Sequence, residues 1–444
     1  MSSSPRCIEL PLPANCVSAV ATQWHKQTGF VWLDSANVFT QGQQFSLVSC
    51  RPTQVRVHRP EEQSADAFLE SWKNAYLAQA TQQSSPLPFS GGWLGALYYD
   101  FGEELLGIKR EARPEGAATA YVAYHPWAVI FDHATNRTFW VDDGQPLDEF
   151  ATLAQCSLNE VNKDWQARPS ETLNRPNWSP LEARCEYEQQ VERILEYLLA
   201  GDSYQVNYAQ PFETKFEGEI WSHYLALRAT NAAPFGACLL QTALDDILCF
   251  SPELFIKAEG SLLVTQPIKG TTPRHKNPNA DARLAEALSK SHKNRAENVM
   301  IVDLLRNDLG RICLPGSVQV NSLCELRSYP SVHHLVSEVQ GTLPDQKTPI
   351  DALKVTFPGG SITGAPKKRS MEIISELERF PRGIYCGSIV ALSNNGTFSS
   401  NIAIRTISIK GGQARVWGGG GIVADSKPKD EYRETLDKLS KILR

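Results

Sequence analysis

The sequence lacks the features that mark membrane proteins, disulfide-rich secreted proteins and nucleic-acid-binding proteins. No apolar run approaches the roughly 20 residues that span a bilayer, and residues 127–131 form one of the longer runs. The 10 cysteines are spread over 444 residues without a C-x-x-C pair, which favours reduced, mostly buried thiols. The formal net charge is −5, so no positive excess is present to hold phosphate backbones. We therefore expect neither a membrane nor nucleic acid as a partner.

The N-terminal segment also lacks the pattern of a secretory signal. Residues 1–16 contain Arg6, Glu9 and three prolines, where a signal needs a basic start and a continuous apolar stretch. We therefore expect a cytoplasmic protein. The composition, 42% apolar and 21% charged, is that of a globular chain long enough to bury a sizeable core.

Two common phosphate-binding motifs and one zinc motif are missing as well. Gly359 and Gly364 have the spacing of a P-loop, but alanine and proline follow where lysine and a hydroxyl residue are needed. Four consecutive glycines begin at Gly418 and fail the G-x-G-x-x-G pattern. Such a cluster can bring backbone N–H groups close to a carboxylate, although a flexible turn explains it equally well. The histidines at 333 and 334 do not form the H-E-x-x-H arrangement of zinc proteases.

The periodicity predicts helices and strands in clusters and so favours an α+β fold with mainly antiparallel sheets. Helices are expected at 187–199, ending at Gly201, at 280–309 with a break near 289–292, and at 366–377. The strand candidates are residues 30–33, 120–124, 127–131, 237–250, 262–267, 387–392, 403–409 and 414–417.

The length alone suggests about three domains of about 150 residues each. Residues 157–180 are polar, contain three prolines and show no periodicity, so they are predicted to form a linker or a surface excursion. This segment separates residues 1–156 from residues 181–444.

Three residues attract attention from their local context. Glu297 and Glu434 lie in predicted helices and suit Mg²⁺, which takes one or two carboxylates, although an isolated helix glutamate is usually just exposed. Lys269 follows the 262–267 strand in a predicted Gly-Thr turn, with Arg274 nearby. A free lysine has a pKa of about 10.4, so nucleophilic chemistry would require burial or neighbouring positive charge. The local sequence alone favours a solvated turn lysine.

Ten segments, taken together and in this order, resemble the chorismate-utilising enzyme family, which includes anthranilate, aminodeoxychorismate, isochorismate and salicylate synthases. The match is strong over residues 185–444 and weak before them. The segments are residues 201–207, 251–253, 267–271, 295–308, 333–337, 357–367, 383–387, 402–406, 418–426 and 431–435. The resemblance implies an α+β fold in which two large antiparallel β-sheets pack as a sandwich with helices outside. Residues 1–156 would add strands to a shared core, and residues 181–444 would form the chorismate-binding region.

Two positions separate the branches of the family. Isochorismate and salicylate synthases carry a water-activating lysine where this chain has Gln205, which points to an ammonia-using branch. Anthranilate synthases read Pro-Ile-Ala-Gly-Thr where this chain reads Pro-Ile-Lys-Gly-Thr at 267–271. The resemblance therefore implies the branch that aminates chorismate at C4 on the way to 4-aminobenzoate and folate.

The same resemblance implies a set of roles. Lys269 would attack C2 of chorismate, Glu253 would protonate the departing C4 hydroxyl, and ammonia would add at C4. Mg²⁺ would be held by Glu297 and Glu434, with Glu431 acting through water. The implied substrate-binding residues are Gln205, Thr271, Ser361, Tyr385, Arg405, Gly419, Gly420, Gly421 and Lys438.

Further implied features concern an acid–base residue, an architectural motif and the ammonia source. His334 matches a family histidine whose acid or base role is best attested in the anthranilate branch. Residues 303–308 match a strong motif of architectural character. A glutaminase needs a cysteine in a G-x-C-x-G elbow, and the sequence around Cys238 lacks the closing glycine. We therefore expect a separate glutamine amidotransferase subunit, or free ammonium, to supply nitrogen.

Three alternatives remain open from the sequence. The chain could be an anthranilate synthase component, against which Lys269 argues; an isochorismate synthase, against which Gln205 argues; or a catalytically inactive regulatory subunit that keeps the fold. Tryptophan-regulated relatives carry Leu-Leu-Glu-Ser near the N-terminus, where this chain has Trp-Leu-Asp-Ser at 32–35. The sequence does not decide whether tryptophan binds there, nor what the oligomeric state is.

Overall fold

The computed structural model describes residues 6–35, 44–81, 85–110, 116–144, 176–329 and 332–443. Residues 157–175 of the predicted linker lie outside the described residues. Its last residues are described, and they include the short strand β9 (Ser179–Pro180). The boundaries proposed at 156 and 181 stay predictions.

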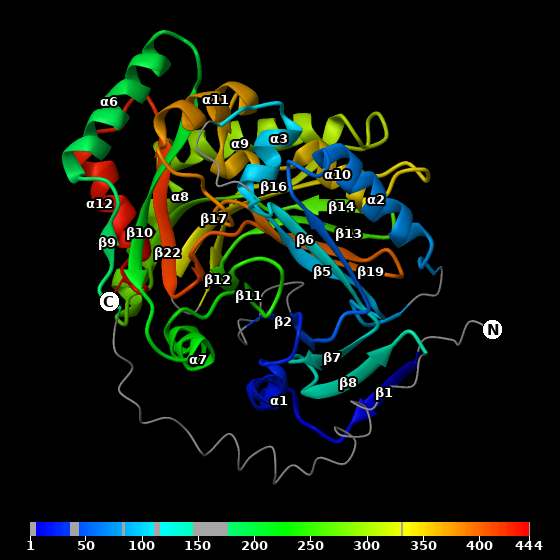
Figure 1. The fold of residues 1–444 in the computed structure, drawn as a ribbon. Coiled ribbons are helices and arrows are strands. Elements are labelled where there is room, and N and C mark those ends of the chain that lie inside the picture. The colour runs from blue at the N-terminus through cyan, green and yellow to red at the C-terminus, as the bar shows by residue number, and fades with distance from the viewer. Residues whose placement is uncertain are drawn as a thin grey trace.

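A 12-stranded antiparallel sheet forms one layer of the structure (Figure 1). The strands from before the linker form one half of its path and those from after the linker form the other, and the two halves join where β2 pairs with β11 in the middle of the sheet. β9 pairs with β10 beside the main path. In spatial order the path is β1 (Arg6–Leu10), β8 (Arg137–Asp142), β7 (Trp127–Asp132), β3 (Phe45–Ser49), β2 (Phe30–Asp34), β11 (Phe235–Leu240), β12 (Asp246–Ser251), β21 (Thr406–Lys410), β22 (Gln413–Ile422), β10 (Gln205–Lys215) and β18 (Gly364–Ala365).

A 10-stranded antiparallel sheet forms the second layer. It also joins early and late strands, since β5 pairs with β19. β16 (Gln319–Ser328) pairs with β17 beside the main path. The path runs β15 (Ile268–Pro273), β17 (Val332–Thr342), β14 (Leu262–Thr265), β13 (Leu254–Glu259), β20 (Phe398–Asn401), β19 (Ser388–Ser393), β5 (Gly92–Leu97), β6 (Ala120–His125) and β4 (Gln54–His58).

The alternation of side chains along the strands builds three apolar layers. In β7, Trp127, Val129 and Phe131 enter a cluster on the outer face of the first sheet, whereas Ala128 and Ile130 enter a cluster between the sheets. Successive residues of a strand point to opposite faces, so a fully apolar run requires cover on both sides. The two sheets therefore pack as a sandwich, and the predicted fold class is confirmed.

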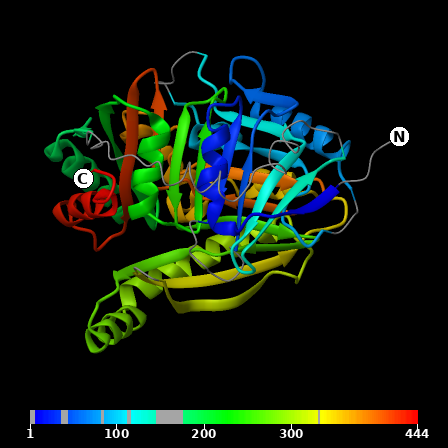
Figure 2. The ribbon, with the colours of Figure 1, turned by 90° about the horizontal axis from the view of Figure 1, so that it is seen from below.

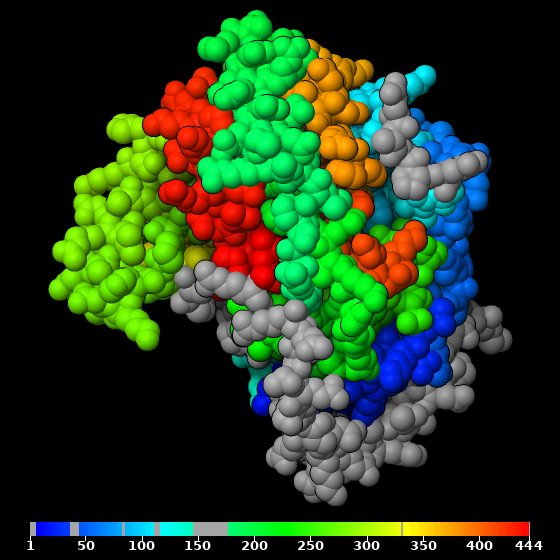
Figure 3. Space-filling view, turned by 60° about the vertical axis from the view of Figure 1, so that its left-hand side comes forward, coloured from blue at the N-terminus to red at the C-terminus, as the bar shows by residue number. Residues whose placement is uncertain are grey.

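Helices cover the outer faces of the sandwich, as Figures 1 and 2 show. The segment from α8 to β17 projects below the rest of the molecule in Figure 2. In Figure 3 the C-terminal helix α12 lies between α6 and this projecting segment. The helices are α1 (Val17–Trp24), α2 (Ala65–Leu77), α3 (Tyr99–Leu105), α6 (Arg184–Leu199), α7 (Ile220–Thr230), α8 (Pro278–Ser289), α9 (His292–Gly310), α10 (Pro349–Thr356), α11 (Lys367–Leu377) and α12 (Pro428–Leu439), with 3-10 turns η1 (Ala14–Cys16) and η2 (Gly360–Ile362).

The three predicted helical regions are confirmed. α6 ends at Leu199, and Gly201 follows with a positive φ of 84°. The expected break in the second region falls between α8 and α9, where the side chain of Ser291 accepts a hydrogen bond from the amide of Asn294 and caps α9.

Two strand-level predictions were wrong, and one open alternative is excluded. Residues 237–250 form two strands, β11 and β12, joined by a turn. Lys269 lies in β15 and not in a turn, at an irregularity of register between Ile268 and Thr271. The flexible turn left open for the four glycines from Gly418 is excluded, because they belong to β22 and pair along β10.

No helix among the described residues is long and apolar enough to cross a membrane. Nine cysteines lie in the described ranges, all of them without a disulfide, and seven are buried.

Candidate functional site

The side chain of Lys269 lies among acidic groups from three other segments. Its Nζ donates a hydrogen bond of 3.2 Å to the backbone oxygen of Ser361 in η2. Burial lowers the pKa of Lys269, while the charges of Glu297 and Glu253 act in the opposite direction. Lys269 is partly buried, and an amine that loses its proton more easily than a surface lysine is chemically suited to nucleophilic attack.

Glu253 and Ser361 form a buried pair beside this lysine. The Ser361 hydroxyl donates to Glu253 Oε1 at 2.8 Å, and Glu253 is 6% exposed. Burial raises the pKa of Glu253, and the hydrogen bond from Ser361 and the charge of Lys269 reduce that rise. A carboxyl held closer to neutrality is a suitable proton donor, so the two groups predicted to act together are placed together.

Carboxylates of α12 meet the glycine strand. A Cβ built on Gly420 would lie 3.4 to 3.5 Å from Glu431 Oε2, Lys438 Nζ and Glu434 Oε1. Lys438 Nζ donates to Glu434 Oε1 at 2.7 Å and to the backbone oxygen of Gly419 at 3.0 Å. Burial opposes ionisation of Glu434, but the charge of Lys438, its hydrogen bond and the charges of two further lysines together outweigh it, so the pKa of Glu434 is lowered.

Glu297 approaches the same cluster from α9. Its charge acts on Lys269, and its Oε1 lies 3.9 Å from Lys293 Nζ. Among the described residues, no three His, Cys, Asp or Glu side chains form a metal-binding group. Two glutamates with hard oxygen donors still fit Mg²⁺, which commonly takes one or two carboxylates and completes its shell with water and substrate.

The glycine strand is packed closely against its neighbour β10. A Cβ on Gly419 would lie 2.2 Å from the backbone oxygen of Tyr208, and one on Gly421 would lie 2.8 Å from the amide carbon of Gln205. The Gln205 side chain is fully buried, and neither its amide nitrogen nor its oxygen has a hydrogen-bond partner among the described residues. Such an unpaired amide is costly unless a ligand satisfies it.

The remaining predicted site residues lie at the edges of this region. His334 Nδ1 and Thr271 Oγ1 are 2.8 Å apart, and burial lowers the pKa of His334 to about 4, so this imidazole is neutral at pH 7. The charge of Arg405 contributes to that lowering. Burial lowers the pKa of Arg405, whose side chain has no ion pair with a described residue. Tyr385 stacks on Trp417 with centroids 5.8 Å apart, directly before the glycine strand.

Arg274, close to Lys269 in the sequence, is directed away from it, and Asp308 of the motif at residues 303–308 binds Lys367. Arg274 pairs with Asp281 at 2.8 Å, so it does not accompany Lys269. Asp308 accepts a hydrogen bond of 2.7 Å from Lys367 Nζ, which also donates to the backbone oxygen of Thr356 at 2.6 Å. This pair ties α9 to both ends of the segment that carries Ser361.

The sequence reasoning missed the buried ion pair of Arg382 and Glu378, whose side chains are 0% and 1% exposed. Nothing in the sequence distinguishes such an arginine from a surface one; its place just before the motif at residues 383–387 was the only signal.

A separate cavity of about 550 Å³ lies between the two sheets at residues 34 and 35. The carboxylate of Asp34 is held there by Arg228 at 2.6 and 2.9 Å and by the Tyr224 hydroxyl at 3.3 Å. The carboxylate of the Trp-Leu-Asp-Ser segment at 32–35 therefore takes part in an internal ion pair.

Comparison with known proteins agrees with this geometry. Residues 29–444 match the family described as chorismate binding enzyme. Aminodeoxychorismate synthase component 1 of Salmonella typhimurium is 40% identical over 91% of this chain and 86% of its own length. The Escherichia coli protein of that name is 42% identical over 81% of this chain and 77% of its own length. The crystal structure of anthranilate synthase component I from Streptococcus pneumoniae superposes with a TM-score of 0.76 at 30% identity, covering 92% of this chain and 94% of that one.

Proposed function

Because the chain belongs to the family of chorismate binding enzymes, we propose that it converts chorismate and ammonia to 4-amino-4-deoxychorismate and water. The observation that carries the proposal is the partly buried amine of Lys269 beside the buried acid Glu253, both of them hydrogen-bonded to Ser361. The two relatives named aminodeoxychorismate synthase component 1 support the same reaction.

The first half of the reaction forms a covalent adduct on Lys269. The neutral amine attacks C2 of chorismate, the ring double bonds shift, and the C4–oxygen bond breaks. Glu253 donates its proton to the departing hydroxyl, which leaves as water. Because Ser361 contacts both Lys269 and Glu253, it aligns the nucleophile and the acid on one ring.

The second half of the reaction exchanges one amine for another. Ammonia adds at C4, the double bonds shift back, and the bond between C2 and Lys269 breaks. The adduct nitrogen keeps both of its hydrogens, so Lys269 leaves as the neutral amine, and the proton that the added nitrogen loses returns to Glu253, which restores the enzyme. Splitting the substitution into two steps lets a poor leaving group depart before ammonia adds, and keeps the new amine at C4.

The charged groups around the lysine suit a dicarboxylate substrate. Arg405, Lys438 and the backbone amides of the glycine strand would bind the carboxylates, and the amide of Gln205 would find its missing partner in the substrate or in ammonia. Mg²⁺ held by Glu297 and Glu434, with Glu431 ordering water, would neutralise one carboxylate and polarise the substrate.

The nitrogen source follows from the name of the relatives. A component 1 implies a second component, and we propose that this partner is a glutamine amidotransferase that delivers ammonia. The fully buried Cys238 has a pKa raised well above that of a free thiol by burial, which is unsuited to a glutaminase nucleophile in this chain.

The test is product identification by chromatography and mass spectrometry after incubation with chorismate, Mg²⁺ and ammonium. We expect 4-amino-4-deoxychorismate, no product without ammonium, and no product from Lys269→Ala. Lys290→Ala is the matched control, because this lysine is exposed and pairs with Glu286 on the surface. Fluorescent anthranilate would establish the anthranilate alternative, and isochorismate formed without ammonium would establish the hydrating one. Turnover with glutamine in place of ammonium, without a partner, would refute the separate subunit.

A further inference from the structure

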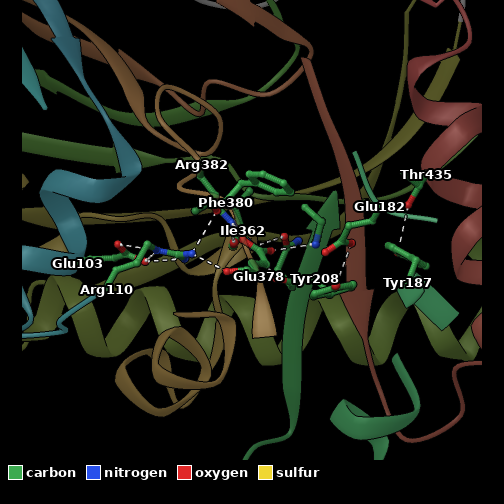
Figure 4. A network of polar contacts seen from close by, with 12 residues as sticks. Glu103, Arg110, Glu182, Tyr187, Tyr208, Ile362, Glu378, Phe380, Arg382 and Thr435 are labelled. Carbon is green, nitrogen blue, oxygen red and sulfur yellow. Dashed lines mark hydrogen bonds and ion pairs between the residues drawn. The ribbon is translucent and has the colours of Figure 1, made fainter. Parts of the chain in front are cut away.

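A fully buried guanidinium connects the segments that carry the candidate catalytic groups. Arg382 pairs with Glu378 through Nε and Nη2 at 2.9 and 2.7 Å. Its Nη1 donates to the backbone oxygen of Ile362 at 3.1 Å, and its Nη2 donates to the backbone oxygen of Asn207 at 2.6 Å (Figure 4). One planar side chain therefore binds η2, β10 and the end of α11 at once.

The two carbonyl groups that Arg382 binds are each next to the proposed site. Ile362 follows Ser361, whose backbone oxygen accepts from Lys269 and whose hydroxyl donates to Glu253. Asn207 lies opposite Gly421 in the pairing of β10 with β22, two residues after Gln205. The guanidinium therefore adds its two side-chain hydrogen bonds to the backbone bond of 2.8 Å from the Asn207 amide to the Thr363 oxygen, and together they hold η2 against the strand that pairs with the glycine strand.

The guanidinium itself is tightly held. Its carbon lies 4.5 Å from the centre of the Tyr99 ring and 5.6 Å from that of Tyr385. Glu378 is held in turn by the amide of Ala209, which donates to its Oε1 at 3.0 Å. Because every partner is buried, the arginine has few alternative orientations, and it can act as a fixed spacer.

We propose that Arg382 is a positioning residue for the chemical step: by fixing η2 against β10, it holds Ser361 where it aligns Lys269 with Glu253. This inference rests on the proposed function, because it assigns those residues to the reaction. It predicts that replacing Arg382 lowers kcat. The fall in kcat should be larger than in a variant that loses another buried arginine and is equally destabilised.

A second buried arginine in the same network supplies the matched control. Arg110 has a 2% exposed side chain, pairs with Glu103, and donates to the backbone oxygens of Glu378 and Phe380. It resembles Arg382 in burial and bonding but contacts neither η2 nor β10. Arg110→Lys and Arg382→Lys each keep a positive charge and remove the planar fork that binds several acceptors.

The experiment compares these two variants with the unchanged full-length protein. We measure kcat and the KM for chorismate with ammonium as the nitrogen source, thermal stability, and hydrogen exchange of peptides covering residues 205–210 and 359–366. Misplacing reacting groups by about 1 Å can cost about 100-fold, so we expect kcat of Arg382→Lys to fall by about that factor. We expect the KM to change by less than about 3-fold, because the proposed carboxylate-binding groups are untouched.

The outcomes separate this inference from the proposed function. Faster exchange in both peptides and a selective loss of kcat in Arg382→Lys, with Arg110→Lys near the unchanged enzyme at similar stability, supports positioning. Equal kcat in both variants, or unchanged exchange at 359–366, overturns it while leaving the proposed function standing. No aminated product from the unchanged enzyme overturns the proposed function, whatever the exchange shows.

A second pair of variants tests the positioning role of Arg382 if Arg382→Lys does not fold. Tyr99→Leu removes the ring that stacks on the guanidinium, and Tyr99→Phe keeps that ring. Selective loss of kcat in Tyr99→Leu supports the inference, and equal kcat in the two variants overturns it.

Discussion

The buried pair of Lys367 and Asp308 permits a prediction whose size can be worked out from the structure. Their side chains are 11% and 4% exposed, and the two charged atoms are 2.7 Å apart. Asp308→Asn leaves the Lys367 ammonium without a counter-charge, although it keeps the Thr356 oxygen as an acceptor. Breaking a buried pair in this way costs about 3–5 kcal/mol, so we expect the free energy of unfolding to fall by about that amount.

The same helix contains an exposed pair that serves as the control. Arg306 and Asp303 are 2.9 Å apart, with side chains 54% and 63% exposed. Because solvent screens such a pair, Asp303→Asn is expected to cost less than about 1 kcal/mol. Replacing Asp308 with leucine and Lys367 with methionine together should recover much of the loss, since two apolar side chains need no counter-charge.

The assay is urea unfolding of each variant, followed by tryptophan fluorescence and circular dichroism. Both probes must give the same transition before the free energies of unfolding are compared. If Asp308→Asn destabilises the protein no more than Asp303→Asn does, the assignment of Asp308 as the buried anchor of the Ser361 segment is wrong.

Three further predictions concern the site itself. Ser361→Ala removes a donor to the ionised carboxylate of Glu253 and so raises the pKa of this acid further. Activity that needs the protonated form is lost as pH rises through that pKa, so the basic limb of the kcat profile should move to higher pH. A basic limb that does not move would contradict the assignment. Gly419→Ala should destabilise the protein, because its Cβ would meet backbone at 2.2 Å, whereas Gly420→Ala should fold and lose activity. Thermal melts and turnover assays of both variants check this. A Gly419→Ala protein as stable as the unchanged one would refute it. Removing divalent metal with EDTA should abolish turnover, and added Mg²⁺ should restore it. Glu434→Gln should raise the Mg²⁺ concentration that turnover requires. Full activity in EDTA would exclude a role for the metal.

The parts of the fold that were predicted from the sequence are those with strong local signals. α6 has apolar residues at helical spacing and a glycine after its end, and the break between α8 and α9 coincides with the capping residue Ser291. The turn between β11 and β12 was missed because residues 241–245 contain neither glycine nor proline, although Gln241 adopts a φ of 56°.

Glycine led to a wrong prediction at one place and left two alternatives open at another, for the same physical reason. Gly270 has a φ of 83° and sits in an irregularity within β15, and not in the turn that its presence suggested. Gly419 is in a strand because the neighbouring backbone leaves no room for a Cβ. A sequence shows that glycine is present, but it does not show whether the cause is a turn, a bulge or a close approach.

The candidate site was predicted through the resemblance and not through local pattern. Lys269 and Glu253 are 16 residues apart and meet through Ser361, a further 92 residues beyond the lysine. Contacts at such separations depend on sheet pairing, which local periodicity does not specify. Arg382 escaped notice for the same reason, since only the folded chain reveals that it is buried.

The most direct test of the central claim is the mass of the intact protein after chorismate and Mg²⁺ are added without ammonium. The account predicts a covalent adduct one water lighter than chorismate, placed on Lys269 by peptide mapping, absent from Lys269→Ala, and released as aminated product when ammonium is supplied. A protein that turns over with ammonium but never carries this adduct would contradict the nucleophilic role of Lys269.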